Sequence, residues 1–247
     1  MKTTLITGGL GFIGSSICEA LLQKKFTDKC VLVDNFGGYM NPIKDGFKDF
    51  RKQRFPSLKN IIIERCDTSN YKALSSILSK YKPNYVYHTA ALPLAKVSNL
   101  NNEEAKISSV DSTVNIIDAI NLLKNSNKKY LIDRFVYFSS SMIYGDFKKS
   151  SVTEESEKNP KDAYGIMKLA GEVVTEGLCK LHNIPYTIIR PSAVYGPKDM
   201  NRRVSQIFIE NAFKKKEILI QGKNEKLDFT YIKDLANGSI IAARSKK

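Results

Sequence analysis

Three groups of side chains in this sequence could act together in proton transfer. Tyr164 and Lys168 are four residues apart, which places them on one face of a helix. A lysine ammonium in that position favours the phenolate and lowers the pKa of the tyrosine, so that the phenol can take a proton from an alcohol. The run Ser139-Ser140-Ser141 ends an apolar segment and could hold the same alcohol, although serines also end strands through purely local hydrogen bonds.

The spacing of tyrosine and lysine is not specific by itself, because Tyr144 and Lys148 repeat it. Tyr144 is followed directly by a glycine in a segment that looks like a turn, where a spacing of four does not define one face. Tyr164 instead opens a long helical pattern, so we expect Tyr164 to carry the proton. We expect structural or cofactor-lining roles for His88 and a solvated helix-end position for His182.

A glycine-rich turn supplies a second candidate site. The segment Thr4–Thr7 reads as a strand, and the run Gly8-Gly9-Leu10-Gly11-Phe12-Ile13-Gly14 follows it and leads into a helical pattern. Strand, tight turn and helix are the context that a dinucleotide fingerprint requires, because the helix start can bind a pyrophosphate. Asp34 comes 20 residues after Gly14, where a carboxylate accepts hydrogen bonds from ribose hydroxyls and repels a 2′-phosphate. We therefore expect NAD rather than NADP; the alternatives are an ordinary loop and a loop-capping aspartate.

The elements that would position these residues alternate between strands and helices. Short β-branched runs separated by amphipathic stretches indicate βαβ units, hence an α/β fold with a doubly wound parallel sheet of the Rossmann type. We expect an NAD-binding domain at 1–190 and a small, incomplete substrate-binding lobe at 191–247, with a helix from Val204 to Phe213, a strand at Ile218–Ile220 and a helix near Leu235. The predicted strands of the sheet are Thr4–Thr7, Val31–Val33, Ile61–Ile63, Tyr85–His88, Phe135–Ser139 and Tyr186–Ile189.

Composition narrows the remaining classes of function. The 247 residues carry a net charge of +14, which raises nucleic acid as a partner, but only eight of the 39 basic residues are arginines and the lysines are spread along the chain. We therefore expect no nucleic-acid partner and favour a solvated basic surface, with attraction of anionic substrates as the alternative. The four cysteines show no metal or disulfide spacing, which favours free buried thiols. No apolar run is long enough to span a bilayer, and we expect a cytoplasmic protein with no membrane partner.

Taken together, these segments resemble the extended short-chain dehydrogenase/reductases, and within them the nucleotide-sugar (NAD-dependent) epimerase/dehydratase family. The matching pieces follow the family order along nearly the whole chain, and their order and spacing are more specific than any single piece. They are Thr7 to Gly14, Asp34-Asn35, Cys66-Asp67, His88 to Ala91, Ser139 to Gly145, Tyr164 to Lys168, Arg190-Pro191, Val194 to Pro197 and Asp228 to Tyr231.

The resemblance implies a role for each matching position. Ser140, Tyr164 and Lys168 would be catalytic, Asp67 would contact adenine, and Pro191 would pack near the nicotinamide. The partners would be a nucleotide-sugar substrate and, in a homodimer, a second copy of the chain. The residues that would contact NAD are Gly8, Gly11, Phe12, Ile13, Gly14, Asp34, Asn35, Asp67, Ala90, Ala91, Leu92, Tyr164, Lys168 and Pro191.

Departures from the family pattern refine the expected activity. Ser141 and Met142 stand where the 4,6-dehydratases carry an acid and a base, which disfavours dehydration, and Ser109 stands where the family often has asparagine. Leu227 replaces an arginine that usually binds the diphosphate, and family members run beyond Lys247. We expect an epimerase, with C4 the favoured carbon, that works through a transient keto sugar. The rivals are an oxidoreductase or decarboxylase on the same scaffold and a truncated NAD-binding remnant.

Overall fold

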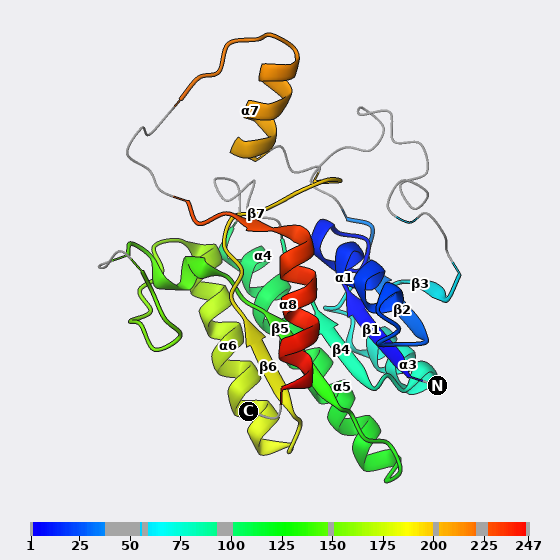
Figure 1. The fold of residues 1–247 in the computed structure, drawn as a ribbon. Helices are drawn as coiled ribbons and strands as arrows, with labels where there is room; N and C mark the ends of the chain where they lie inside the picture. The colour runs from blue at the N-terminus through cyan, green and yellow to red at the C-terminus, as the bar shows by residue number, and fades with distance from the viewer. Residues whose placement is uncertain are drawn as a thin grey trace.

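The central sheet of this protein is parallel throughout. The computed structural model describes residues 2–37, 55, 59–92, 101–147, 151–199, 203–220 and 227–245. Six strands pair in the order β3-β2-β1-β4-β5-β6, so the strand order reverses between β1 and β4, as in a doubly wound fold (Figure 1). The strands are β1 (Thr3–Thr7), β2 (Lys29–Asp34), β3 (Ile61–Arg65), β4 (Tyr85–His88), β5 (Arg134–Phe138) and β6 (Tyr186–Ile189). The expected fold class and its six strands are confirmed.

Two hydrophobic cores lie on opposite faces of this sheet. Alternate strand residues point to opposite faces, so Leu5 of β1 belongs to one core and Ile6 to the other. Helices α3 (Tyr71–Tyr81), α5 (Ser112–Ser126) and α6 (Ala163–Leu181) contribute to the first core. Helices α1 (Phe12–Gln23) and α8 (Ile232–Arg244) cover the second face, with α8 beside α1 in Figure 1. Burial on both faces explains why the strands read as nearly continuous apolar runs.

Side-chain caps define where two of the helical segments begin. The Asn101 side chain accepts a hydrogen bond from the Glu104 amide at 2.7 Å and starts α4 (Asn102–Lys106). A π turn at Ile107–Asp111 joins α4 to α5 in one continuous helical segment. The Asp162 side chain accepts from the Gly165 amide at 2.7 Å and starts α6. This cap fixes the first turn of the helix that carries Tyr164.

The chain after β6 is more loosely organised. A two-stranded parallel sheet pairs β7 (Val194–Tyr195) with β8 (Thr230–Tyr231), and α7 (Val204–Phe213) lies beyond the carboxyl ends of the strands in Figure 1. The strand expected at Ile218–Ile220 is wrong: these residues are irregular and their side chains are exposed. Without a neighbouring strand, β-branched residues alone do not form a ladder. Helix α8 lies within 191–247, the range expected for the substrate-binding lobe, yet it packs on the main sheet. We therefore propose only α7 and the segments around it as the substrate lobe.

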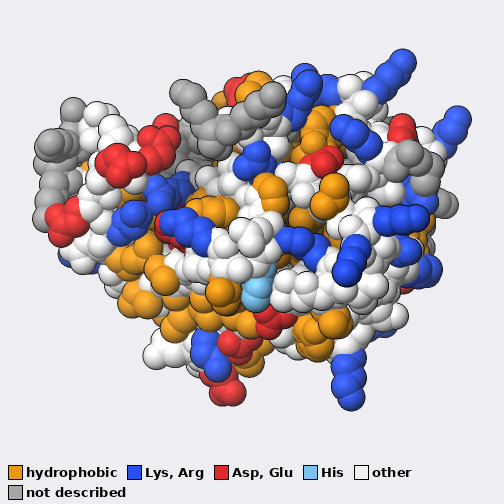
Figure 2. Space-filling view, turned by 90° about the horizontal axis from the view of Figure 1, so that it is seen from below, with side chains coloured by type: hydrophobic (Ala, Val, Ile, Leu, Met, Phe, Trp, Pro, Cys, Tyr) orange, Lys and Arg blue, Asp and Glu red, His pale blue; other side chains and the backbone are white. Residues whose placement is uncertain are grey.

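The surface and the thiols agree with the composition. All four cysteines are free and buried, as expected. In Figure 2, the lysine and arginine side chains on the visible face are scattered among other residues, with acidic side chains between some of them. Within the described ranges, no helix has the length and hydropathy of a membrane span.

Candidate active site

The glycine-rich turn is packed too tightly to accept side chains. Gly8 has a φ of +64°, and a Cβ there would lie 2.9 Å from the backbone N and Cα of Ala90, which follows β4. A Cβ on Gly14 would lie 2.4 Å from the Gly8 carbonyl oxygen. The first turn of α1 therefore lies directly against the end of β1, and Ala90 lies beside Gly8. Residues of the glycine-rich turn and of the segment after β4 are thus close enough to contact one ligand.

The start of α1 presents unpaired backbone donors. Gly11 is the N-cap residue and makes no side-chain cap hydrogen bond. In the described part of the chain, the N–H groups of Phe12, Ile13 and Gly14 have no hydrogen-bond acceptor. Free N–H groups at the positive end of a 12-residue helix form a site for an anion such as a pyrophosphate. This geometry fits the role expected for Phe12 and Ile13.

Asp34 at the end of β2 caps its own loop, which is one of the alternatives considered from the sequence, and it also binds the glycine-rich turn, which the sequence did not reveal. One carboxylate oxygen accepts from the Leu10 amide at 3.0 Å, and the other accepts from the Phe36 amide at 2.9 Å. Asp34 therefore holds the glycine-rich turn itself, in addition to placing a negative charge beside it. The turn motif and the aspartate, expected as separate contacts to a dinucleotide, form one hydrogen-bonded unit.

Asn35 and Asp67 meet at the same edge of the sheet. The Asn35 amide nitrogen donates to the Asp67 carboxylate at 2.8 Å, and the Ser69 backbone amide donates to its other oxygen at 2.8 Å. Partial burial raises the pKa of Asp67, but these hydrogen bonds outweigh it and leave the pKa below its usual value. Asp67 is thus a fixed acceptor close to the end of β2.

His88 is buried and links the end of β4 to its neighbours. Its Nδ1 lies 2.7 Å from the Thr7 hydroxyl, and its Nε2 lies 3.3 Å from the Ser112 hydroxyl. Because Ser112 donates to the Ser108 carbonyl at 2.6 Å, its oxygen accepts from Nε2–H, and Nδ1 accepts from Thr7. Burial and the positive charge of Lys168 lower the pKa of His88 to about 3. His88 is therefore a neutral structural residue.

The Thr7 hydroxyl extends this chain of contacts to the predicted cofactor loop. It accepts from the Ala90 amide at 3.3 Å, so the His88 network positions the first residue of Ala90-Ala91-Leu92. All three residues are half-buried, and Ala90 packs against Gly8 of the glycine-rich turn.

The three candidate catalytic side chains come together at the carboxyl end of β5. Ser140 follows β5 and starts the 3₁₀ helix Ser141–Tyr144 by accepting from the Met142 amide at 3.2 Å, and its hydroxyl is near enough to the half-buried Tyr164 to lower the pKa of the phenol. The Lys168 Nζ lies 5.8 Å from the centroid of the Tyr164 ring and donates to the Phe138 carbonyl at 2.7 Å. Ser140 therefore makes the local hydrogen bond that serines form at the end of a strand and also lies beside the Tyr164 phenol.

Burial dominates the pKa of both titratable groups in this triad. Burial raises the pKa of Tyr164 above its usual value, although Arg203 and the hydrogen bond with Ser140 partly oppose it. The expected decrease caused by Lys168 is therefore wrong in direction, because the cost of burying a phenolate is larger. Burial lowers the pKa of Lys168 to about 8, and the Glu172 carboxylate opposes this change.

Pro191 lies at the same end of the sheet. Its carbonyl accepts from the Ser141 amide at 3.0 Å, which connects the end of β6 to the turn that carries Ser140. In the proposed lobe, Leu227 is exposed and Arg203 donates to the Val194 carbonyl at 3.2 Å. Lys148 and Arg202 lie outside the described residues.

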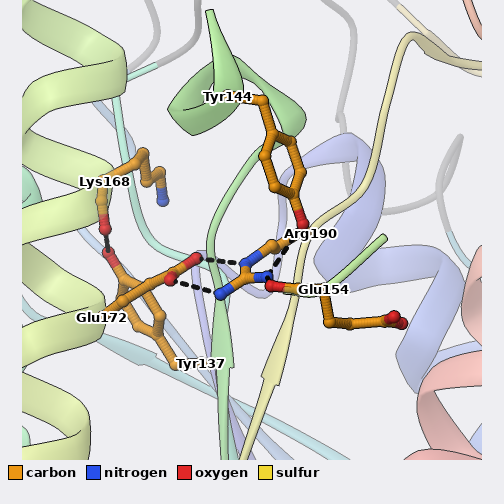
Figure 3. A network of polar contacts seen from close by, with 6 residues as sticks. All are labelled: Tyr137, Tyr144, Glu154, Lys168, Glu172 and Arg190. Carbon is orange, nitrogen blue, oxygen red and sulfur yellow. Dashed lines mark hydrogen bonds and ion pairs between the residues drawn. The ribbon is translucent and has the colours of Figure 1, made fainter. Parts of the chain in front are cut away.

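A buried ion pair beneath the triad was not foreseen from the sequence. Arg190 binds both oxygens of Glu172 at 2.8 Å each, and the same guanidinium donates to the Tyr144 hydroxyl at 2.8 Å and the Glu154 carbonyl at 3.0 Å (Figure 3). The hydroxyl of Tyr144, the alternative candidate for proton transfer, thus accepts a hydrogen bond from Arg190. The only hint in the sequence was the spacing of Glu172, one helical turn after Lys168.

Comparisons with known proteins cover nearly the whole chain. A family model described as the NAD dependent epimerase/dehydratase family matches residues 4–247. The uncharacterized UDP-glucose epimerase YtcB of Bacillus subtilis is 29% identical over 239 residues, which are 95% of this chain and 70% of that protein. UDP-glucuronate 4-epimerase 1 of Arabidopsis thaliana is 29% identical over 243 residues, which are 96% of this chain and 54% of that protein.

A solved structure gives the same similarity in three dimensions. The UDP-glucuronic acid 4-epimerase of Bacillus cereus, in complex with UDP-glucuronic acid and NAD, superposes with a TM-score of 0.81 at 29% identity. The match covers 99% of this chain and 74% of that one.

Proposed function

Because this chain belongs to the NAD-dependent epimerase/dehydratase family, we propose that it is a nucleotide-sugar epimerase that acts at C4. The observation that carries the proposal is the meeting of Ser140, Tyr164 and Lys168 at the sheet edge that also holds the glycine-rich turn. The UDP-sugar 4-epimerases among its relatives support the choice of substrate class and of carbon. Ser141 and Met142 carry no carboxyl group, so the acid and base of a dehydratase are missing at these positions.

The residues of the cofactor site fit NAD. The unpaired N–H groups at the start of α1 suit the pyrophosphate, and the Asp34 carboxylate suits unmodified ribose hydroxyls and repels a 2′-phosphate. When bound, NAD⁺ would supply the hydride acceptor and a positive ring beside the phenol, and the hydride would return to the opposite face of the sugar carbon.

The protein side chains would handle the proton and the orientation of the sugar. Ser140 would hold the C4 hydroxyl by a hydrogen bond, and Tyr164 would take its proton as the carbonyl forms. Because burial raises the pKa of Tyr164, the phenol needs nearby positive charge to act as a base. Arg203 lowers this pKa, and the Lys168 ammonium lies 5.8 Å from the centroid of the ring. In the reverse step, Tyr164 would return the proton to the C4 oxygen, so the turnover leaves no net change in the enzyme.

Incubation with NAD⁺ and each of three sugars, UDP-glucose, UDP-N-acetylglucosamine and UDP-glucuronate, tests this function. We expect one sugar to interconvert with its C4 epimer, measured by chromatography, without net NADH absorbance. Stoichiometric NADH would instead identify an oxidoreductase or a decarboxylase. NAD binding by calorimetry with no change in any sugar would identify a cofactor-binding remnant.

A further inference from the structure

We propose that Glu172 is a positioning residue of the candidate active site: its carboxylate, held by Arg190, stabilises the positive charge of the buried Lys168 ammonium, one helical turn away on α6. This proposal deepens the proposed function, since it assigns a role to a residue that touches neither sugar nor cofactor. Figure 3 shows the arrangement, with Glu172 and Lys168 on α6 and Arg190 after β6.

Burial is the first step of the argument. Lys168 and Glu172 are 3% and 4% exposed, and they lie one helical turn apart on α6. In such an environment a single charge is strongly disfavoured, whereas opposite charges stabilise each other more than they would at the surface. A buried ammonium at residue 168 therefore depends on a buried carboxylate nearby.

The second step is the absence of another described carboxylate facing Lys168. The ammonium donates to the Phe138 carbonyl and lies 5.3 Å from the Tyr137 ring centroid on β5 and 5.8 Å from that of Tyr164. From β4 it faces the neutral His88, and Arg190 after β6 is positive and bound to Glu172. Among the described residues, Glu172 alone opposes the decrease that burial causes in the pKa of Lys168.

The third step is the way in which Arg190 fixes the carboxylate. A guanidinium that binds both oxygens leaves Glu172 one orientation, and its further bonds to the Tyr144 hydroxyl and the Glu154 carbonyl anchor it to two other segments. Tyr144 ends the 3₁₀ helix that Ser140 begins. The ion pair thus connects the helix of Tyr164 and Lys168 to the turn of Ser140.

The direct test measures the protonation of Lys168 in the protein without substrate. In protein labelled with ¹³C-lysine, the Lys168 signal is assigned by its loss in Lys168→Arg and titrated by NMR. We expect a midpoint near 8 in the wild type and one lower by about 1 pH unit in Glu172→Gln. Glu176→Gln is the matched control, because Glu176 lies on the same helix in an exposed pair with Lys180, and its midpoint should equal that of the wild type.

If Glu172→Gln does not fold, the double variant Glu172→Gln/Arg190→Gln is measured instead. It removes both members of the ion pair, so Arg190 is not left as an unpaired buried charge. Its Lys168 midpoint should also fall below the wild-type value. Equal midpoints in the wild type and in the Glu172 variants that fold would overturn the proposal. With an active substrate, the alkaline limb of kcat should move to lower pH with the NMR midpoint. Because the NMR titration needs no sugar, its result still tests the role of Glu172 if the protein turns out not to be an epimerase.

Discussion

Helix α6 contains a glycine whose replacement by alanine should destabilise the protein although alanine is the better helix former. A Cβ on Gly171 would lie 2.1 Å from the Tyr137 hydroxyl oxygen and 2.7 Å from its Cζ. Tyr137 is fully buried and its hydroxyl donates to the Lys168 carbonyl at 3.3 Å, so the ring has no free space into which to move. In Gly171→Ala, either α6 moves away from β5 or this hydrogen bond breaks.

The two opposing effects have different sizes. Alanine gains about 1 kcal/mol of helix propensity. Overpacking costs about 1–3 kcal/mol, and losing the tyrosine hydrogen bond costs about 1 kcal/mol more. We therefore expect Gly171→Ala to lower the free energy of unfolding by about 2 kcal/mol. Gly177→Ala in the same helix is the control, because a Cβ there meets nothing within 4 Å, and it should raise the free energy of unfolding by about 1 kcal/mol.

Urea denaturation followed by circular dichroism measures both changes. Tyr137→Phe removes the oxygen that lies closest to the added methyl group, so Gly171→Ala should cost less in that background than in the wild type. A Gly171→Ala protein as stable as the wild type would refute the packing argument. Because Tyr164 and Lys168 lie on the same helix, the variant should also lose activity in proportion to any displacement of α6.

Three further predictions concern the cofactor, the proton and the pH dependence of stability. Calorimetry should show that the wild type binds NAD⁺ more tightly than NADP⁺. Asp34→Ala should reduce this preference, and it should lower the affinity for both cofactors because the contact with the Leu10 amide is lost. Equal affinities of the wild type for NAD⁺ and NADP⁺ would contradict the role of Asp34. Tyr164→Phe should abolish sugar-dependent reduction of bound NAD⁺, and the reverse pattern, with only Tyr144→Phe inactive, would show that the assignment is wrong. His88 has a pKa of about 3 in the folded state, against an ordinary value of 6.5 in an unfolded chain. As the pH falls, the unfolded chain therefore binds a proton at His88 before the folded protein does. The free energy of unfolding should therefore fall as the pH decreases from 6.5 toward 3, by up to about 1.4 kcal/mol per unit, and His88→Gln should show a shallower dependence in urea titrations.

Local patterns predicted the parts of the molecule that depend on neighbouring residues. The run from Thr4 through Gly14 shows strand, turn and helix start in its spacing alone, and Tyr164 lies at the beginning of a capped helix as its context indicated. Ile218–Ile220 misled because β propensity indicates only that a residue suits a sheet. Whether a partner strand lies beside it depends on distant residues.

Contacts between distant residues were not accessible in this way. The hydrogen bond between Asp34 and the Leu10 amide and the ion pair of Glu172 with Arg190 depend on how strands and helices meet, and no pairwise spacing encodes that. The direction of the pKa of Tyr164 was also missed for this reason, since spacing places Lys168 nearby but gives no information on burial. The sequence thus predicted which groups meet at the site more reliably than it predicted their electrostatic state.

The position of α8 on the main sheet bears on the order in which the protein can fold during synthesis. Leu235 and Ile240 of α8 share a core with Val136 and Phe138 of β5, and Arg134 donates to the Ala243 carbonyl, 109 positions later in the chain. The ribosome therefore releases β4, β5 and α6 long before α8, which covers the second face of the sheet. Until α8 emerges, the apolar strand residues that it covers stay exposed to solvent, and exposed hydrophobic surface favours aggregation. The glycine-rich turn can form early, but the sheet that supports it is closed by a helix whose residues lie about a hundred positions after β5.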